Sequence, residues 1–478
     1  MIPTTKPEMS IDDLQFSTEP APRFDWPLAN EAEEFLRGRV DSFLEHNGSA
    51  RRLAQKMLEE TGTDIFEWVD HLVLPRADEV ALRRVGFVRE DQVEAPEGQD
   101  AYEHPRATLP RVLVGGTSGP NPSVLALRPE SVADFISRQH LSAEPEGKPL
   151  SQFRRVTVAQ EAGTKLEAVE RRAYRGFLFR ALGAGELQSI IKARELWRTR
   201  PRFCASDAEG FKVAGQVLER VLGLVGRDLA CQLFFEAERE YWESRNRAAQ
   251  VQKSRQDQLG LGWGNHDHHT FRCSREHFVD VVSFLRKLGF QKRERYYAGA
   301  EAGWGAQICE NPVVGIVVFA DVDLMPDETH IDFSSVRLAS APRLGTVGLW
   351  VGLHGESLLE AGMHHLEARF EFALLREQLK ACGIETMAPF SDFAFLRQAF
   401  TQGERWPVRH ERAQRLLSAG LISQEQFDRF AREGALGSHL ENLQRHGGFK
   451  GFNQKSVSVV IAATDPRKSH FQAAPAAA

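Results

Sequence analysis

Residues 265–272, with the sequence NHDHHTFR, place three histidines and a carboxylate within five positions, just before an amphipathic segment that ends at residues 288–290. Because side chains alternate across a strand, His266 and His268 would share one face and His269 would lie on the other. At most two of these histidines can therefore contact one metal ion. The remaining ligands of such an ion have to come from elsewhere in the chain.

A second segment has the same order of features. Residues 68–74 read WVDHLVL, a short strand pattern with an Asp-His pair that contains His71, and they run into a short helix that ends at Gly86-Phe87. The two copies of a histidine-bearing strand, a helix and a Gly-Phe pair indicate a repeated βα unit.

The composition fixes the general class of the chain. Its 478 residues, 42% hydrophobic and 26% charged, predict a globular protein of two or three packed units. The net charge of -6 argues against a nucleic-acid-binding surface, so we expect small-molecule partners. The scattered cysteines lack a CxxC pair, which is typical of a reducing cytoplasm. No apolar run approaches the roughly 18 residues of a membrane span.

The pattern along the chain predicts six segments. They are an extended arm, a helix followed by a first strand-rich module, a helical insert, a second strand-rich region with the metal site, a helical segment with a closing strand, and a disordered tail. Their bounds are residues 1–30, 31–135, 136–262, 263–408, 409–470 and 471–478.

Some stretches of the second half are harder to interpret. Residues 345–353 read as a strand, and residues 408–444 read as helical. Residues 363–372 fit either period: as a helix they form an apolar stripe, and as a strand they place His365, Glu367 and Arg369 on one face. Residues 455–462 are expected to close the chain as a strand.

The chain resembles the vicinal oxygen chelate superfamily, and within it the 2-oxoadipate dioxygenase/decarboxylase (D-2-hydroxyglutarate synthase) family. The resemblance rests on a histidine followed by a basic residue, a Leu-Arg-Pro strand end, a His-x-Thr-x-Arg strand and a late Val-Ser pair. These are His71 with Arg76, residues 127–129, His268 with Thr270 and Arg272, and Val457 with Ser458. It departs from the family in the spacing between His71 and Arg76 and between His268 and the expected glutamate.

The resemblance implies an α+β fold of βαβββ modules that form a half-open barrel around a divalent metal, with a large helical insert and C-terminal helices. It implies two histidines and one carboxylate as metal ligands, here His71, His268 and Glu404, the last of these in a stretch before a helix. Other candidates for the carboxylate stay open, as does a ligand role for one further histidine: they are Glu371, Glu356, Asp332 and His365.

The same resemblance implies a non-haem Fe(II) centre, although another divalent metal stays open. The implied reaction is a dioxygenation with decarboxylation, which converts a 2-oxo (di)carboxylic acid and O2 to a 2-hydroxy acid. Two imidazoles and a carboxylate leave adjacent coordination positions open for such a substrate. A distal substrate carboxylate would pair with a guanidinium, for which Arg76 and Arg272 are candidates, and Val457 and Ser458 would contact the substrate.

Two other functions fit the sequence. One is a redox-neutral isomerase, epimerase or lyase of the same superfamily, which would use a divalent metal as a Lewis acid and be indifferent to O2. The other is a metal-free binding protein that keeps the fold. The helical insert and the C-terminal helices either cap the barrel or form the interface of a homo-oligomer.

Overall fold

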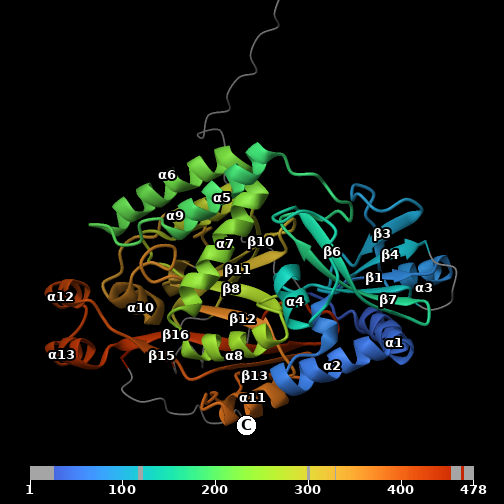
Figure 1. Ribbon diagram of the computed structural model, residues 1–478. Coiled ribbons are helices and arrows are strands. Elements are labelled where there is room, and N and C mark those ends of the chain that lie inside the picture. The colour runs from blue at the N-terminus through green and yellow to red at the C-terminus, as the bar shows by residue number, and fades with distance from the viewer. Residues whose placement is uncertain (1–25, 117–121, 299–301, 329, 454–463, 468–478) are drawn as a thin grey trace, which may run out of the picture.

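The computed structural model describes residues 26–116, 122–298, 302–328, 330–453 and 464–467. It confirms the α+β class: two mixed sheets lie beside one another, with helices around them (Figure 1). Within the described ranges, no helix is both long and apolar enough to cross a membrane.

The first sheet is formed by the N-terminal third of the chain. Its strand order is β2-β3-β4-β1-β5-β7-β6, and β1 runs parallel to β4 and antiparallel to β5. The strands are β1 (Val69–Leu74), β2 (Val88–Arg89), β3 (Gln99–Glu103), β4 (Arg111–Gly115), β5 (Val124–Leu127), β6 (Phe153–Glu161) and β7 (Thr164–Arg171).

The second sheet is formed by the C-terminal half. Its order is β13-β14-β16-β12-β8-β11-β10-β9, and β15 pairs with β16 off this path. The strands are β8 (His266–Arg272), β9 (Gln291–Tyr297), β10 (Trp304–Asn311), β11 (Ile316–Asp323), β12 (His365–Arg369), β13 (Ser391–Phe393), β14 (Leu396–Phe400), β15 (Glu404–Trp406) and β16 (Ala435–Arg445).

The two sheets repeat one pattern, as the duplicated βα unit predicts. In the first module, β1 is followed by α3 (Glu79–Arg84) and three strands, the last of which returns parallel to β1. In the second sheet, β8 is followed by α9 (Phe278–Lys287) and three strands, and β11 returns parallel to β8. The strands β5 and β12 each start a further module at the corresponding place. The expected βαβββ modules are therefore present.

The helix predicted at the start of residues 31–135 is present as two helices. Helices α1 (Asn30–His46) and α2 (Gly48–Thr61) are separated by Asn47, whose side chain accepts a hydrogen bond from the backbone N–H of Ala50. An asparagine side chain at this position satisfies a free N–H of the first turn, so it starts the second helix.

The segment predicted as a helical insert, residues 136–262, is only partly helical, because β6 and β7 lie within it and complete the first sheet. The remaining part forms helices that pack against the outer face of the second sheet (Figure 1). There Phe235 contacts His269 and Phe271 of β8, with ring centroids 4.9 and 6.1 Å away. These helices are α5 (Ala184–Arg198), α6 (Asp207–Val225), α7 (Arg227–Glu243) and α8 (Arg247–Gln258), whereas α4 (Val132–Arg138) packs against β6 and β7 of the first sheet.

Residues 345–353 were predicted as a strand, which is wrong: they form helix α10 (Thr346–His354). The stretch is apolar on all sides, so its periodicity cannot separate a strand from a buried helix. A distant residue starts the helix. The carboxylate of Asp323, at the end of β11, accepts hydrogen bonds from the backbone N–H groups of Gly345, Val347 and Gly348 at 2.6, 3.1 and 3.0 Å.

Replacing Asp323 with alanine should therefore destabilise the protein. The substitution leaves several N–H groups at the start of α10 without an acceptor, and we expect a loss of roughly 2–4 kcal/mol in the free energy of unfolding. Denaturant titration measures this loss. The control is Asp327→Ala, an exposed acid in the following loop, which should change the stability little. Equal stability of both variants would show that α10 does not depend on this carboxylate.

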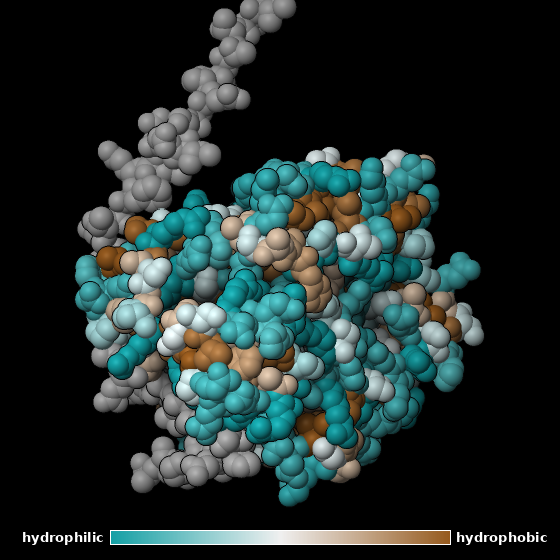
Figure 2. Space-filling view, turned by 90° about the vertical axis from the view of Figure 1, so that its left-hand side faces the viewer, coloured by the Kyte–Doolittle hydropathy of each residue, from teal (hydrophilic) through white to brown (hydrophobic). Residues whose placement is uncertain are grey.

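The C-terminal part corrects a second prediction. Residues 408–444 were predicted as helical, but only α12 (His410–Ser418) and α13 (Gln424–Glu433) are helices, and the buried strand β16 follows them. Residues 363–372 contain the strand β12, after which α11 (Phe372–Ala381) begins. The face that carries α12 and α13, shown in Figure 2, is mainly hydrophilic with separate apolar patches. The expected closing strand, residues 455–462, lies outside the described residues.

Candidate metal centre

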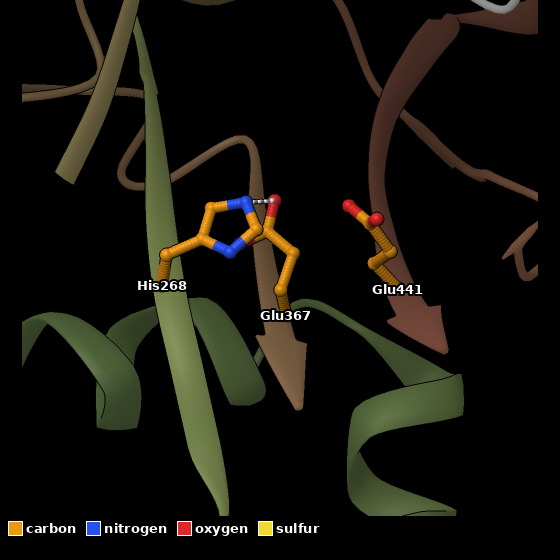
Figure 3. Close-up of side chains that lie close together, drawn as sticks. All are labelled: His268, Glu367 and Glu441. Atoms are coloured by element: carbon orange, nitrogen blue, oxygen red, sulfur yellow. Dashed lines mark ion pairs between the residues drawn. The ribbon is translucent and has the colours of Figure 1, made fainter. Parts of the chain in front are cut away.

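Three side chains that can bind a metal meet on neighbouring strands of the second sheet. The register places Glu367 of β12 opposite His268 of β8 on one side and opposite Glu441 of β16 on the other. One ligand atom of each residue lies within 4.8 Å of the others, and the side chains point toward one another (Figure 3). All three are buried, with 3, 0 and 2% of their surface exposed. Atoms bound to one ion are at most about 4.2 Å apart, so a small movement suffices to close the group on an ion.

A neighbouring carboxylate fixes the orientation of the His268 imidazole. Its Nδ1 lies 2.9 Å from the carboxylate of Asp267, which Arg369 and Arg445 contact at 2.9 and 3.0 Å. Although burial raises the pKa of Asp267, the two guanidinium groups hold it well below its ordinary value. The Nδ1 proton is therefore directed at Asp267, and Nε2 faces Glu367 at 3.2 Å. Burial lowers the pKa of His268, which keeps the imidazole neutral, as a metal ligand requires.

The two glutamates carry the strongest argument for a cation. Burial raises the pKa of Glu367 well above its ordinary value, and the neighbouring Glu441 raises it further; burial also raises the pKa of Glu441, to about 8. Their carboxylates accept hydrogen bonds from Thr270 at 2.9 Å and from Gln398 at 2.7 Å, but Oε2 of Glu367 has no hydrogen-bond partner in the described part of the chain. A divalent cation would neutralise both carboxylates, so these residues fit a metal.

The donor set narrows the choice of metal. One imidazole nitrogen and two carboxylates are harder ligands than thiolates and suit Fe(II), Mn(II), Zn(II) or Mg(II). His365 extends the group: its Nε2 contacts the carboxylate of Glu367 and lies 3.7 Å from that of Glu441. His365, which the sequence left open as a ligand, thus lies beside the two glutamates of the centre.

Of the three predicted ligands, the structure brings only His268 to this group. His71 lies on β1 of the other sheet, where its Nδ1 hydrogen-bonds to Asp70 at 2.8 Å. Glu404 lies on β15, and its carboxylate accepts a hydrogen bond from the backbone N–H of Arg247 at the start of α8. Among the described residues, His268 is therefore grouped with Glu367 and Glu441, and not with His71 or Glu404.

The other carboxylates that the sequence left open have different partners. Glu371 accepts a hydrogen bond from the N–H of Leu374 at the start of α11, and the two carboxylate oxygens of the buried Glu356 share a hydrogen bond from the N–H of Ser274. Asp332 binds serine hydroxyls in the loop after β11. None of the three belongs to the group around His268 that the described residues form.

The two predicted arginines lie in different surroundings. Arg76 is half exposed and pairs with Asp100 on the first sheet, away from the centre. Arg272 is on the same strand as His268, four residues further, and is 2% exposed. Its Nε lies 3.5 Å from Asp321, and its Nη1 has no hydrogen-bond partner among the described residues. Val457 and Ser458 lie outside the described residues.

The sequence contained a partial signal for the glutamates. The strand reading of residues 363–372 placed Glu367 on one face with His365, but it did not show which strand would lie beside it. Glu441 lies in a segment that was predicted as helical, so its pairing with Glu367 was missed altogether.

Comparison with known proteins yields only distant similarity. No protein-family model matches the chain, and no curated protein matches it. A mutant of 4-hydroxymandelate synthase from Streptomyces coelicolor is 12% identical, with 84% of this chain and 98% of that chain covered and a TM-score of 0.28. Methylmalonyl-CoA epimerase from Mycobacterium tuberculosis is 11% identical, with 38% of this chain and 88% of that chain covered and a TM-score of 0.22. A Mn(II)-bound glyoxalase from Novosphingobium aromaticivorans is 10% identical, with 79% of this chain and 82% of that chain covered and a TM-score of 0.18.

Proposed function

We propose that the chain is a metal-dependent enzyme with His268, Glu367 and Glu441 as its metal ligands. We further propose that it is a non-haem Fe(II)-dependent dioxygenase and decarboxylase that acts on a 2-oxo acid. The single observation that carries the metal site is the buried pair of carboxylates beside a neutral imidazole, since two adjacent carboxylates in the interior need a positive charge.

The composition of the group supports chemistry at the metal. Three protein ligands leave coordination positions free for substrate, in contrast to a closed structural site. A bound Fe(II) supplies the redox chemistry with O2, while the protein supplies orientation and charge. The rings of Phe452 and Phe319 lie 4.8 and 6.5 Å from that of His268, so aromatic side chains lie beside the imidazole while its two nitrogens face Asp267 and Glu367.

Arg272 supports an acidic substrate. Alternation along β8 places it on the same face as His268, about 13 Å further along the strand. A guanidinium binds a carboxylate at two points. A 2-oxo acid with a second carboxylate would therefore be held at its 2-oxo end by the metal centre and at its far end by Arg272.

A redox-neutral reaction is the second candidate, and one observation favours it. Such an isomerase, epimerase or lyase needs a group that exchanges protons near neutral pH. Burial raises the pKa of Asp321 to about 7 against the effect of the nearby Arg272. With Mn, Ni, Zn or Mg as a Lewis acid, Asp321 would serve as the acid or base.

O2 uptake separates the two candidates. Protein purified without oxygen and loaded with Fe(II) should bind one iron per chain. It is then tested against a panel of 2-oxo acids that includes 2-oxoadipate, and with at least one of them it should consume O2 and release CO2. Bound metal without O2 consumption on any acid of the panel would favour the redox-neutral reaction. Failure to bind any divalent metal would favour the third function considered, a metal-free binding protein.

Replacing Arg272 with methionine should weaken binding of a dicarboxylic 2-oxo acid. A charge-assisted bidentate pair contributes on the order of 2–3 kcal/mol, so we expect KM to rise about 30- to 150-fold. The matched comparison is a monocarboxylic 2-oxo acid of the same length, whose KM should change little. An equal rise for both acids would show that Arg272 acts through the fold rather than on the far carboxylate.

A further inference from the structure

A cavity with polar side chains in its wall lies against the first sheet, apart from the residues of the metal centre. It has a volume of about 280 Å³, and His71 of β1 and Glu167 of β7 line it. Only 4 and 3% of the surface of these two residues is exposed. Both side chains form part of the cavity wall, where a ligand can reach them.

The strand register shows what this cavity corresponds to. In the second sheet, His268, Glu367 and Glu441 lie opposite one another on β8, β12 and β16. In the first sheet, the same strand positions on β1, β5 and β7 hold His71, Ala126 and Glu167. The first sheet thus repeats the framework of the metal centre with an alanine in the place of Glu367.

The alanine changes what the framework can bind. His71 and Glu167 offer two ligand atoms, fewer than the three protein ligands of an ordinary catalytic metal site. Ala126 is buried against Phe153, which lines the cavity, so no third ligand atom is present at this position. The position therefore suits an organic molecule better than an ion.

The two polar groups both require a hydrogen-bond donor. Nδ1 of His71 hydrogen-bonds to Asp70, and Arg171 holds that carboxylate at 2.7 Å, so the lone pair of Nε2 is left as an acceptor. Burial lowers the pKa of His71 and keeps the ring neutral. Glu167 is an acceptor as well. A ligand ammonium group carries enough hydrogen atoms and the right charge for both.

The other residues of the cavity wall suit a ligand that has a carboxylate and an apolar side chain. Lys165 lines it with its Nζ 3.4 Å from Glu167, and once a ligand ammonium neutralises Glu167, this lysine can pair with a ligand carboxylate. Arg155 also lines the cavity, but Glu146 already binds its guanidinium at 3.0 Å. The remaining wall includes Leu113 and Phe177.

We propose that this cavity binds a small apolar α-amino acid without a metal. The ammonium group is held by His71 and Glu167, the carboxylate by Lys165, and the side chain by the apolar wall. The site is independent of the metal centre, because it lies in the other sheet and uses other residues. It gives the chain a second ligand, whose binding does not depend on the proposed reaction.

Three probes of similar shape test the proposal by calorimetric titration. Leucine carries both charged groups, 4-methylpentanoate lacks the ammonium group, and 3-methylbutylamine lacks the carboxylate. Leucine should bind, and each of the other two should bind at least about tenfold more weakly, since each lacks a charge-assisted contact. Absence of leucine binding up to about 10 mM, or equal binding of all three, would overturn the proposal.

Two variants locate the binding. Ala126→Leu pushes Phe153, which lines the cavity, into it, and Glu167→Gln removes the charge that attracts the ammonium group. Each variant should lower leucine affinity at least about tenfold. His268→Ala is the control, and it should leave leucine binding unchanged while it removes the metal. Circular dichroism and thermal unfolding show whether the two cavity variants are folded. Leucine affinity that is unchanged in both of them would place its site elsewhere and contradict the proposal.

Discussion

Replacing Glu441 with glutamine should remove tight metal binding. The substitution keeps the size of the side chain and the contact with Gln398, but it takes one negative charge and one strong ligand from the group. Loss of a supporting partner alone costs a metal site 10- to 100-fold in affinity, so loss of a direct ligand should cost at least about 100-fold. The measurement is titration of the metal-free protein with Mn(II) or Fe(II) under anaerobic conditions, together with the metal content after dialysis.

The control for this experiment is Glu404→Gln. Glu404 was the carboxylate favoured by the sequence, and in the structure it binds the first N–H of α8. Its substitution should leave the metal content unchanged, as should His71→Ala. If Glu404→Gln or His71→Ala lost the metal while Glu441→Gln kept it, the ligands would be those that the sequence favoured, and the group on β8, β12 and β16 would not be the metal site.

The difference between these two ligand sets shows what the sequence could predict. His268 was identified because its signal is local: histidines beside an aspartate on a strand, followed by a helix, in a unit that occurs twice. The aspartate proves to be the partner that orients the imidazole. Short-range alternation was sufficient for this residue, and it also placed Glu367 on one face of a strand.

The partner strand could not be predicted in the same way. Glu441 meets Glu367 because β12 and β16 pair in parallel, with three strands and three helices between them in the chain. Parallel pairing leaves no turn whose residues reveal the register. Residues before β16 have a strong helical pattern, and that pattern was extended through the strand. The helix α10 was missed for a related reason, since its start depends on Asp323 from another element.

The metal-free protein should lose stability as the pH rises from 7 to 8. A carboxyl group whose pKa is raised in the folded state stabilises the fold most fully below its unfolded pKa, near 4.5, and that contribution is lost as the pH rises through the folded value. For Glu441 the folded value is about 8, and Glu367 shifts in the same direction. Above pH 7 the buried histidines, whose pKa values are lowered, change the stability little, because they are then neutral in both the folded and the unfolded state.

Thermal unfolding of the metal-free chain at several pH values measures this loss, and two comparisons assign it. Metal-loaded protein should show a much weaker dependence, because the cation replaces the proton that the carboxylates otherwise need, and metal affinity should rise over the same interval. Metal-free Glu441→Gln should be more stable than the parent chain at pH 8, since glutamine has no proton to lose. If that variant kept the full pH dependence, the titrating group would lie outside the pair, and the case for a cation between the two glutamates would fail.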